Sequence, residues 1–201
     1  MYIEQASACF FVKTTGGIKM IKMVEKTGMA ISLALLSGSV MAADFMDDAW
    51  AKQACNAWNQ SAALTGGLAQ MPGDMFGDGY KWIDNDAGRG YKMIQIYRDG
   101  NNCGPKKSIQ LNIVKKGGKA MCVYGGKPDG KKMNFAVDYI MHATDKNWIC
   151  MGSGSCGVMG SMMTGKLKFQ GPKMEAMKVM DPFSAFLKLT GKVPGAKNAC
   201  K

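Results

Sequence analysis

The chain has 201 residues, of which 26 are lysine or arginine and 15 are aspartate or glutamate, so its formal net charge at pH 7 is +11. The lysines are dispersed, and Arg89 and Arg98 are the only arginines, so the arginine-rich stripe and stacking aromatics typical of a nucleic-acid interface are missing. This pattern argues against a nucleic-acid partner. The length suits one compact α+β domain once a targeting segment is removed.

The first 42 residues contain the parts of a secretory signal peptide. Three lysines between positions 19 and 26 precede an apolar stretch over 29–40, and small residues lead up to Ala42. The apolar core has about 12 residues, whereas a membrane span needs about 20. We therefore predict an upstream extension and signal peptide over 1–42, cleavage after Ala42, one domain over 43–201, and a periplasmic or secreted location.

The predicted domain begins with a helix from Asp44 to about Leu64. Apolar residues recur there near a 3.6-residue period, and Asp44 is a suitable N-cap. A loop is expected over 66–79, because this stretch is rich in glycine and contains a proline. Two strands are expected next, over 91–98 and 108–115.

The second of these strands and the turn after it predict the register of a hairpin. Apolar and polar residues alternate over 109–113, which indicates a sheet with one buried face. The sequence Lys-Gly-Gly-Lys over 116–119 is typical of a two-residue hairpin turn, and it places Ile113 opposite Cys122. Cys103 then lies too far along the strand to bond to Cys122.

The last third of the chain is expected to hold short elements. Alternation in its strand puts Leu167 and Phe169 on one face and two lysines on the other. A final helix opens at Pro172, which suits a first helical position, and Pro182 should kink or break this helix near Met180. The elements expected before it are an extended run over 133–143, short helices over 145–151 and 156–164, and a strand over 166–169.

The cysteine content agrees with export. Loss of Cys9 with the signal peptide leaves an even set of six, which suits disulfides in an oxidising compartment. The candidates are Cys55 and Cys200, which take Cys103 and Cys122 in an order that the sequence leaves open, and Cys150 and Cys156, which close a small loop.

Catalytic and metal-binding signatures are sparse. His142 is the only histidine, and a lone histidine on a strand is more often a packing or surface residue. The chain has no CxxC, HExxH or CxxCH motif. A GxGxxG match over 152–157 is followed by too few residues for a dinucleotide fold, and a Walker-like match over 160–166 has Leu167 where a hydroxyl should hold magnesium. We predict no catalytic residue, no metal site and no cofactor.

Methionine is the distinctive residue of this composition, with 19 copies. Its flexible, polarisable side chain lines cavities for irregular apolar ligands as well as ordinary cores. Besides core filling, two functional interpretations stay open: a hydrophobic ligand tunnel, or capture of copper(I) by thioethers in an exported protein. The methionines gathered around the last strand are Met159, Met162, Met163, Met174, Met177 and Met180.

A motif runs through this methionine-rich region. It reads MTGKLKFQG over 163–171 and continues as PKMEAMKVM over 172–180. This resembles the C-terminal signature of the sterol-carrier-protein type-two family, close to GKLKIxG before an LAMKL-like helix start. The likeness also includes 135–160 and extends less closely to Tyr91. It implies a five-stranded, mostly antiparallel sheet with covering helices that enclose an apolar tunnel for sterols, fatty acids or other long-chain lipids.

The resemblance also implies residue roles. Leu167 and Phe169 would face the tunnel, the methionines of the last helix would line it, and Met162 and Met163 would border its mouth. We therefore expect an exported lipid carrier rather than an enzyme, with a methionine-rich copper(I)-binding protein as the alternative. Nearby lysines suit an acidic head group or transient contact with an anionic membrane surface. The implied ligand-binding residues are Met162, Met163, Leu167, Phe169, Met174, Met177, Met180, Phe183 and Phe186.

Overall fold

A computed structural model describes residues 43–71 and 80–200 of the chain. The predicted signal peptide and part of the predicted loop over 66–79 lie outside the described residues. None of the described helices is long and apolar enough to cross a membrane.

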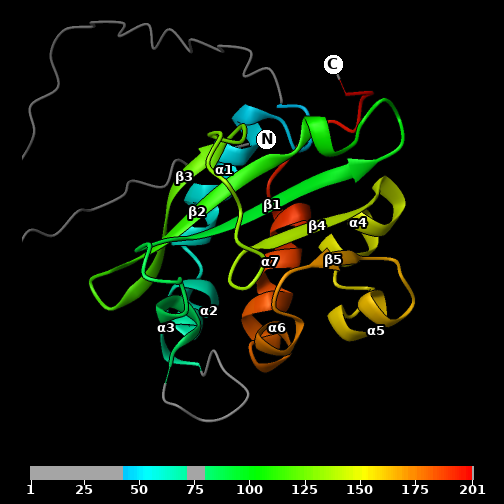
Figure 1. Cartoon of the computed structure of the whole chain (residues 1–201). Helices are drawn as coiled ribbons and strands as arrows, with labels where there is room; N and C mark the ends of the chain where they lie inside the picture. Colours follow the sequence, from blue (N-terminus) through cyan, green and yellow to red (C-terminus); the bar gives the residue numbers. More distant parts are fainter. Residues whose placement is uncertain (1–42, 72–79, 201) are drawn as a thin grey trace, which may run out of the picture. The chain divides into compact units, whose positions relative to one another are not determined.

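A mixed sheet of five strands lies at the centre of the domain (Figure 1). The strand order is β3-β2-β1-β4-β5, in which β1 and β4 pair in parallel and all other neighbours are antiparallel. This confirms the predicted α+β class and the mostly antiparallel sheet. The strands are β1 (Lys92–Asp99), β2 (Ile109–Lys116), β3 (Lys119–Gly126), β4 (Tyr139–Thr144) and β5 (Lys168–Gln170).

The long helices α1 and α7 pack against the sheet and against each other. Trp58 of α1 meets Phe186 of α7 edge-on, with ring centroids 5.9 Å apart, and its Nε1 donates to the Ala120 oxygen of β3 at 2.9 Å. The core therefore lies between the sheet and these helices. The helices are α1 (Asp48–Asn59), α2 (Ala62–Thr65), α3 (Gly67–Gln70), α4 (Asp145–Gly152), α5 (Val158–Met163), α6 (Lys173–Lys178) and α7 (Met180–Lys192), with 3-10 turns η1 (Trp82–Asp84) and η2 (Pro105–Lys107).

The first helix starts later and ends earlier than predicted. Asp47, not Asp44, caps α1, because its Oδ1 accepts from the Trp50 amide at 2.7 Å. Asp44 instead pairs in extended conformation with Ala196 near the C-terminus. Ser61 caps a separate short helix, α2. The helical spacing of apolar residues therefore continues past the end of α1, but the helical backbone is interrupted there. Part of the predicted loop is also helical, as α3.

The β2–β3 hairpin forms in the predicted register. Gly117 and Gly118 have φ of +58° and +70°, as a two-residue turn with two positive φ angles requires. Ile113 pairs with Cys122, which confirms the prediction.

Both faces of β2 are buried, which corrects the prediction of one buried face. Gln110 is fully buried, and its Nε2 donates to Asn112 Oδ1 at 2.8 Å and to Asp129 Oδ1 at 3.0 Å. Asn112 is also buried and donates to Asp129 Oδ2 at 3.3 Å. The loop after β3 thus covers the polar face and satisfies its hydrogen bonds, as burial demands.

The hydrogen bonds of the Asp129 carboxyl predict how the stability of the protein changes at acid pH. Desolvation acts to raise its pKa, but hydrogen bonds from Gln110, Lys131 and Asn112 outweigh it and hold the pKa at about 2, below the ordinary 3.8. A carboxyl with a lowered folded-state pKa contributes stability above pH 3.8 that is lost as the pH falls toward 2. We expect Asp129→Asn to lower the free energy of unfolding by about 1 kcal/mol in urea at pH 7, allowing for solvent screening, and by less at pH 2. An equal loss at both pH values would contradict this.

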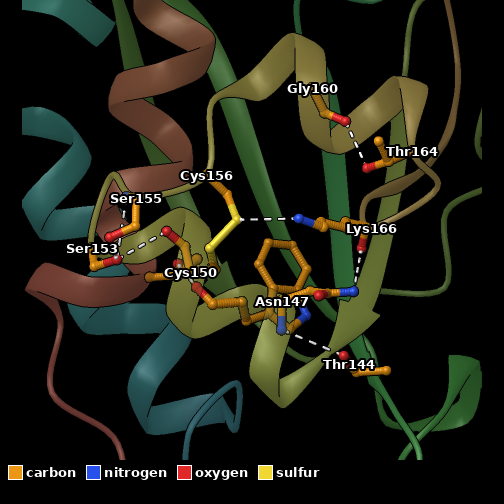
Figure 2. Close-up of a disulfide and its surroundings, with 11 residues drawn as sticks. Thr144, Asn147, Cys150, Ser153, Ser155, Cys156, Gly160, Thr164 and Lys166 are labelled. Carbon is orange, nitrogen blue, oxygen red and sulfur yellow. Dashed lines mark hydrogen bonds between the residues drawn. A yellow bond between two sulfur atoms is a disulfide. The ribbon is translucent and has the colours of Figure 1, made fainter.

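All six cysteines of the described range form disulfides: Cys55–Cys122, Cys103–Cys200 and Cys150–Cys156. This confirms the predicted small loop and decides the pairing that the sequence left open. Figure 2 shows the loop disulfide between α4 and α5, with Lys166 Nζ 4.0 Å from a sulfur atom of the bond. Asn147 of α4 donates to the Lys166 oxygen at 3.1 Å, which ties this loop to the residues that enter β5.

The C-terminal helical segment is broken in two, close to where Pro182 predicts. Val179 lies between α6 and α7 with φ −114° and ψ 41°, outside the helical region, and Pro182 sits in the first turn of α7. Before α6, Gly171 has φ +128°, and a Cβ there would lie 2.4 Å from the Asp138 oxygen. Helix α6 is therefore a short, separate helix between two non-helical joints.

Candidate ligand pocket

An apolar pocket lies between the sheet and the helices that cover it. Its floor is Ile94 of β1, Tyr139 and Met141 of β4, and Phe169 of β5. Its walls come from α1, α2, α3 and η1 on one side and from the α6–α7 segment on the other. The wall residues are Trp58, Leu64, Leu68, Trp82, Ala176, Val179, Pro182, Phe183 and Phe186.

The free space in this pocket is about 30 Å³. A water molecule needs roughly 10–15 Å³ of such space, so the pocket holds two or three water-sized groups. The described residues therefore contain a small pocket and do not show the tunnel that the resemblance implied. A sterol or an acyl chain fits there only if a wall moves.

Helix α6 forms part of the wall between the pocket and solvent. Ala176 and Val179 are buried and line the pocket, whereas Met174 and Met177 on the other side of the helix are 48% and 41% exposed. One layer of helix, joined to its neighbours at Gly171 and Val179, thus forms this part of the wall.

A buried polar cluster holds α6 in place. Lys92 of β1 is fully buried, and its Nζ lies 2.8 and 3.0 Å from the two carboxylate oxygens of Glu175 on α6. Tyr139 donates its hydroxyl to Glu175 Oε2 and accepts from Trp82 Nε1 at 2.9 Å. Asn85 donates to Glu175 Oε1 at 2.9 Å, and its backbone oxygen accepts from Lys92 at 2.8 Å.

Burial shifts the pKa of both charged members of this cluster, Glu175 and Lys92. Desolvation raises the pKa of Glu175 above its ordinary value, although Lys92 and Tyr139 oppose the shift. Desolvation also lowers the pKa of Lys92, with Glu175 acting in the opposite direction. Each charge is stable in this place only because the other is there.

The predicted ligand-binding residues fall into three groups. Phe169, Phe183 and Phe186 line the pocket. Leu167 is buried outside the lining, and Met162 and Met180 are half-buried against the core. Outside the lining and exposed to solvent are Met163, Met174 and Met177.

The sequence analysis missed Lys92 and Glu175, although the sequence carries a signal for one of them. Alternation along β1 puts Lys92 and Arg98 on the same face as Ile94 and Ile96, and the structure buries all four. A basic side chain on a core-facing position needs an acidic partner. Arg98 finds one in Asp145, at 2.6 Å.

His142 is engaged in pairing and stacking. Its Nδ1 lies 2.8 Å from Asp99 Oδ1, and its ring stacks on Tyr97 with centroids 4.4 Å apart. These contacts fit the packing role that the sequence suggested.

A second, larger cavity of about 390 Å³ lies where the two ends of the described chain meet. Asp47, Arg98, Lys106 and Lys127 are among its lining residues. Filling it with hydrocarbon would require desolvation of these charged groups, which is costly. The smaller apolar pocket is therefore the better candidate for a lipid-like ligand.

The sheet, its covering helices and the pocket define an α+β domain. No protein-family model matches the chain, and no curated protein matches its sequence. Its fold is similar to solved structures of sterol carrier proteins. A crystal structure of sterol carrier protein 2 is 15% identical over 75% of this chain and 99% of that chain, with a TM-score of 0.46.

Two solution structures are similar in the same way. One is a conserved hypothetical protein of Thermus thermophilus, suggested to be a sterol carrier protein, with 13% identity, coverage of 79% of this chain and 98% of that chain, and a TM-score of 0.44. The other is sterol carrier protein domain 2 of Helicoverpa armigera, with 18% identity, coverage of 73% and 94%, and a TM-score of 0.39. Values this low describe a distant likeness of fold, so the ligand has to be inferred from the pocket itself.

Proposed function

We propose that this protein is an exported carrier of a lipid-like ligand, whose hydrocarbon part it holds in the pocket beneath α6. The observation that carries this proposal is an apolar pocket between the sheet and its helices, one wall of which is a short helix, α6. Burial of a ligand's hydrocarbon contributes about 0.8 kcal/mol per methylene before the costs of ordering. The resemblance of residues 163–180 adds the ligand class, which is a sterol, a fatty acid or another long-chain lipid.

The polar atoms around the pocket favour a ligand that inserts its apolar end. The lining residues with polar side-chain atoms are Trp58, Trp82 and Tyr139, and each of these atoms already has a protein partner. Trp58 Nε1 donates to the Ala120 oxygen, Trp82 Nε1 donates to the Tyr139 hydroxyl, and that hydroxyl donates to Glu175. The pocket therefore offers apolar contacts to its ligand, and a polar head group would stay at the surface. Lys173 and Lys178 on α6 are placed to contact an acidic head group there.

Entry of the ligand requires the α6 wall to move. Gly171 and Val179 provide non-helical joints at its two ends, and rotation at such joints can displace a short helix as a unit. The Lys92–Glu175 contact would return the helix to its closed position.

Export and the absence of catalysis are part of the same proposal. Three disulfides support an oxidising compartment, in keeping with a signal peptide over 1–42 and cleavage after Ala42. A carrier needs no catalytic group. No observation favours the copper(I) alternative, in which methionine thioethers would be the ligands.

Filling the pocket from α6 tests the proposal. We expect Ala176→Leu, which adds carbon where Ala176 lines the pocket, to weaken binding of a fluorescent fatty acid about 4- to 15-fold, since one or two displaced methylenes are worth about 0.8 kcal/mol each. Met177→Leu is the matched control, because it alters the neighbouring, exposed position and should leave binding unchanged. Thermal unfolding checks that both variants are folded.

A second measurement identifies the ligand. Native mass spectrometry of the protein purified from its own exported compartment should reveal a co-purified lipid, released by organic solvent. Equal fatty-acid binding by the two leucine variants, together with no lipid in the purified protein, would overturn the proposal.

A further inference from the structure

Segment 158–180 exposes an unusual number of methionines. Four of the eight large hydrophobic side chains that the described residues expose are methionines of this segment. Met163, at the end of α5, is 80% exposed, and Met174 and Met177 are neighbours on the outer face of α6. Met159 is the fourth. Met174 and Met177 thus form an exposed apolar pair on one helix, and such a pair indicates a contact with an apolar partner.

The same segment is basic. It contains Lys166, Lys168, Lys173 and Lys178, and its one acidic residue, Glu175, is buried against Lys92. Lys168 Nζ lies 3.6 Å from Asp99 Oδ2, so its charge is partly balanced. Within the described residues, the other three lysines form no ion pair with an acidic side chain. The exposed charge of the segment is therefore positive.

The methionines and lysines of this short segment match the apolar interior and the charged head-group layer of an anionic bilayer. The apolar side chains can enter the boundary of the acyl chains while the lysines stay among the phosphates. A protein partner would need a complementary apolar surface with acidic residues around it, whereas an anionic bilayer presents this combination at any point.

We propose that α6, with Met174 and Met177 outward and Lys173 and Lys178 beside them, docks the protein on an anionic phospholipid bilayer. Helix α6 also forms a wall of the pocket, so after docking only this helix would lie between the bilayer and the ligand. The inference that lipid passes at α6 rests on the proposed carrier function. The docking itself does not.

Vesicle binding tests the docking. We expect the exported, oxidised protein to co-sediment with vesicles of phosphatidylcholine mixed with phosphatidylglycerol, and only weakly with pure phosphatidylcholine. Each lysine near an anionic surface contributes about 1 kcal/mol, or roughly fivefold, so Lys173→Glu with Lys178→Glu should lower binding by about 25-fold or more. Added salt should weaken binding of the unchanged protein.

The methionine face is tested with a matched pair of double variants. Met174→Ser with Met177→Ser should lower binding to the anionic vesicles about tenfold, because each methionine buries roughly half of its side chain on docking. Val123→Ser with Ile149→Ser removes side chains that are 55% and 52% exposed outside the segment, and should leave binding unchanged. Equal effects of the two double variants, or equal binding to charged and uncharged vesicles, would overturn the docking proposal.

Two further measurements separate this inference from its rivals. Sedimentation of the free protein shows whether the methionine face is a contact between two copies: a dimer that the Met174→Ser/Met177→Ser variant dissociates, with vesicle binding unchanged, would overturn docking. Fatty-acid binding without vesicles should be the same in this variant as in the unchanged protein. If vesicles bind through α6 but no fatty acid binds, the carrier function fails and the docking stands.

Discussion

Replacing Lys92 with methionine is expected to lower the free energy of unfolding by about 3–5 kcal/mol, the cost of leaving a buried charge without its partner. Glu175 is 4% exposed and would keep its carboxylate bonded to Tyr139 and Asn85, and Lys92 is its only ion-pair partner among the described residues. Urea unfolding of the oxidised protein at pH 7 measures the loss.

Two further variants serve as controls for the loss of stability in Lys92→Met. Lys52→Met removes the lysine of the Lys52–Asp48 pair, whose lysine side chain is 66% exposed, and should cost at most about 1 kcal/mol because exposed pairs contribute little. Lys92→Met with Glu175→Gln removes both buried charges while an oxygen remains to accept from Tyr139, so it should recover most of the loss. Similar costs for Lys92→Met and Lys52→Met would show that the buried pair does not hold the fold together.

The pH dependence has a definite sign. Because burial raises the folded-state pKa of Glu175 above 4.5, the proton-bound form favours the folded protein below that value, and this contribution is lost as the pH rises through the folded-state pKa. Lys92 has a lowered folded-state pKa, so its contribution increases as the pH rises toward 10.5. A protonated Glu175 needs no cation, so the difference between Lys92→Met and the unchanged protein should narrow as the pH is lowered from 7 to 4.

Local rules account for the parts of the fold that the sequence predicts well. Two adjacent glycines at 117 and 118 decide the turn, and the turn decides that Ile113 faces Cys122. Pro182 decides where the last helix breaks. Each of these features depends on residues close together in the chain, so a single sequence contains all the information required.

The candidate site depends instead on contacts that sequence patterns do not record. Lys92 and Glu175 are 83 positions apart, and nothing along the chain marks them as partners. The resemblance implied that Met174 and Met177 line the tunnel and that Met163 borders its mouth, and all three side chains are exposed. An apolar residue on a six-residue helix can face either side. The small Ala176 lines the pocket, while its larger neighbour Met177 faces outward.

Loss of the Cys103–Cys200 disulfide is expected to destabilise the protein by about 4–5 kcal/mol, because a cross-link that closes a long loop removes the most disorder from the unfolded chain. This bond spans 97 positions, against 6 for Cys150–Cys156. We expect Cys103→Ala with Cys200→Ala to cost about twice as much as Cys150→Ala with Cys156→Ala, which should lose about 2 kcal/mol.

Urea unfolding distinguishes this explanation from one based on native contacts. A chain freed of the long cross-link exposes more surface when it unfolds, so the slope of free energy against urea should increase for Cys103→Ala/Cys200→Ala and change little for Cys150→Ala/Cys156→Ala. If the short-loop variant loses as much stability, the packing around Cys156, including the nearby Lys166, matters more than chain entropy. In that case the loop between α4 and α5 would be a principal support of β5. It would also support the pocket floor, because Phe169 of β5 lines the pocket.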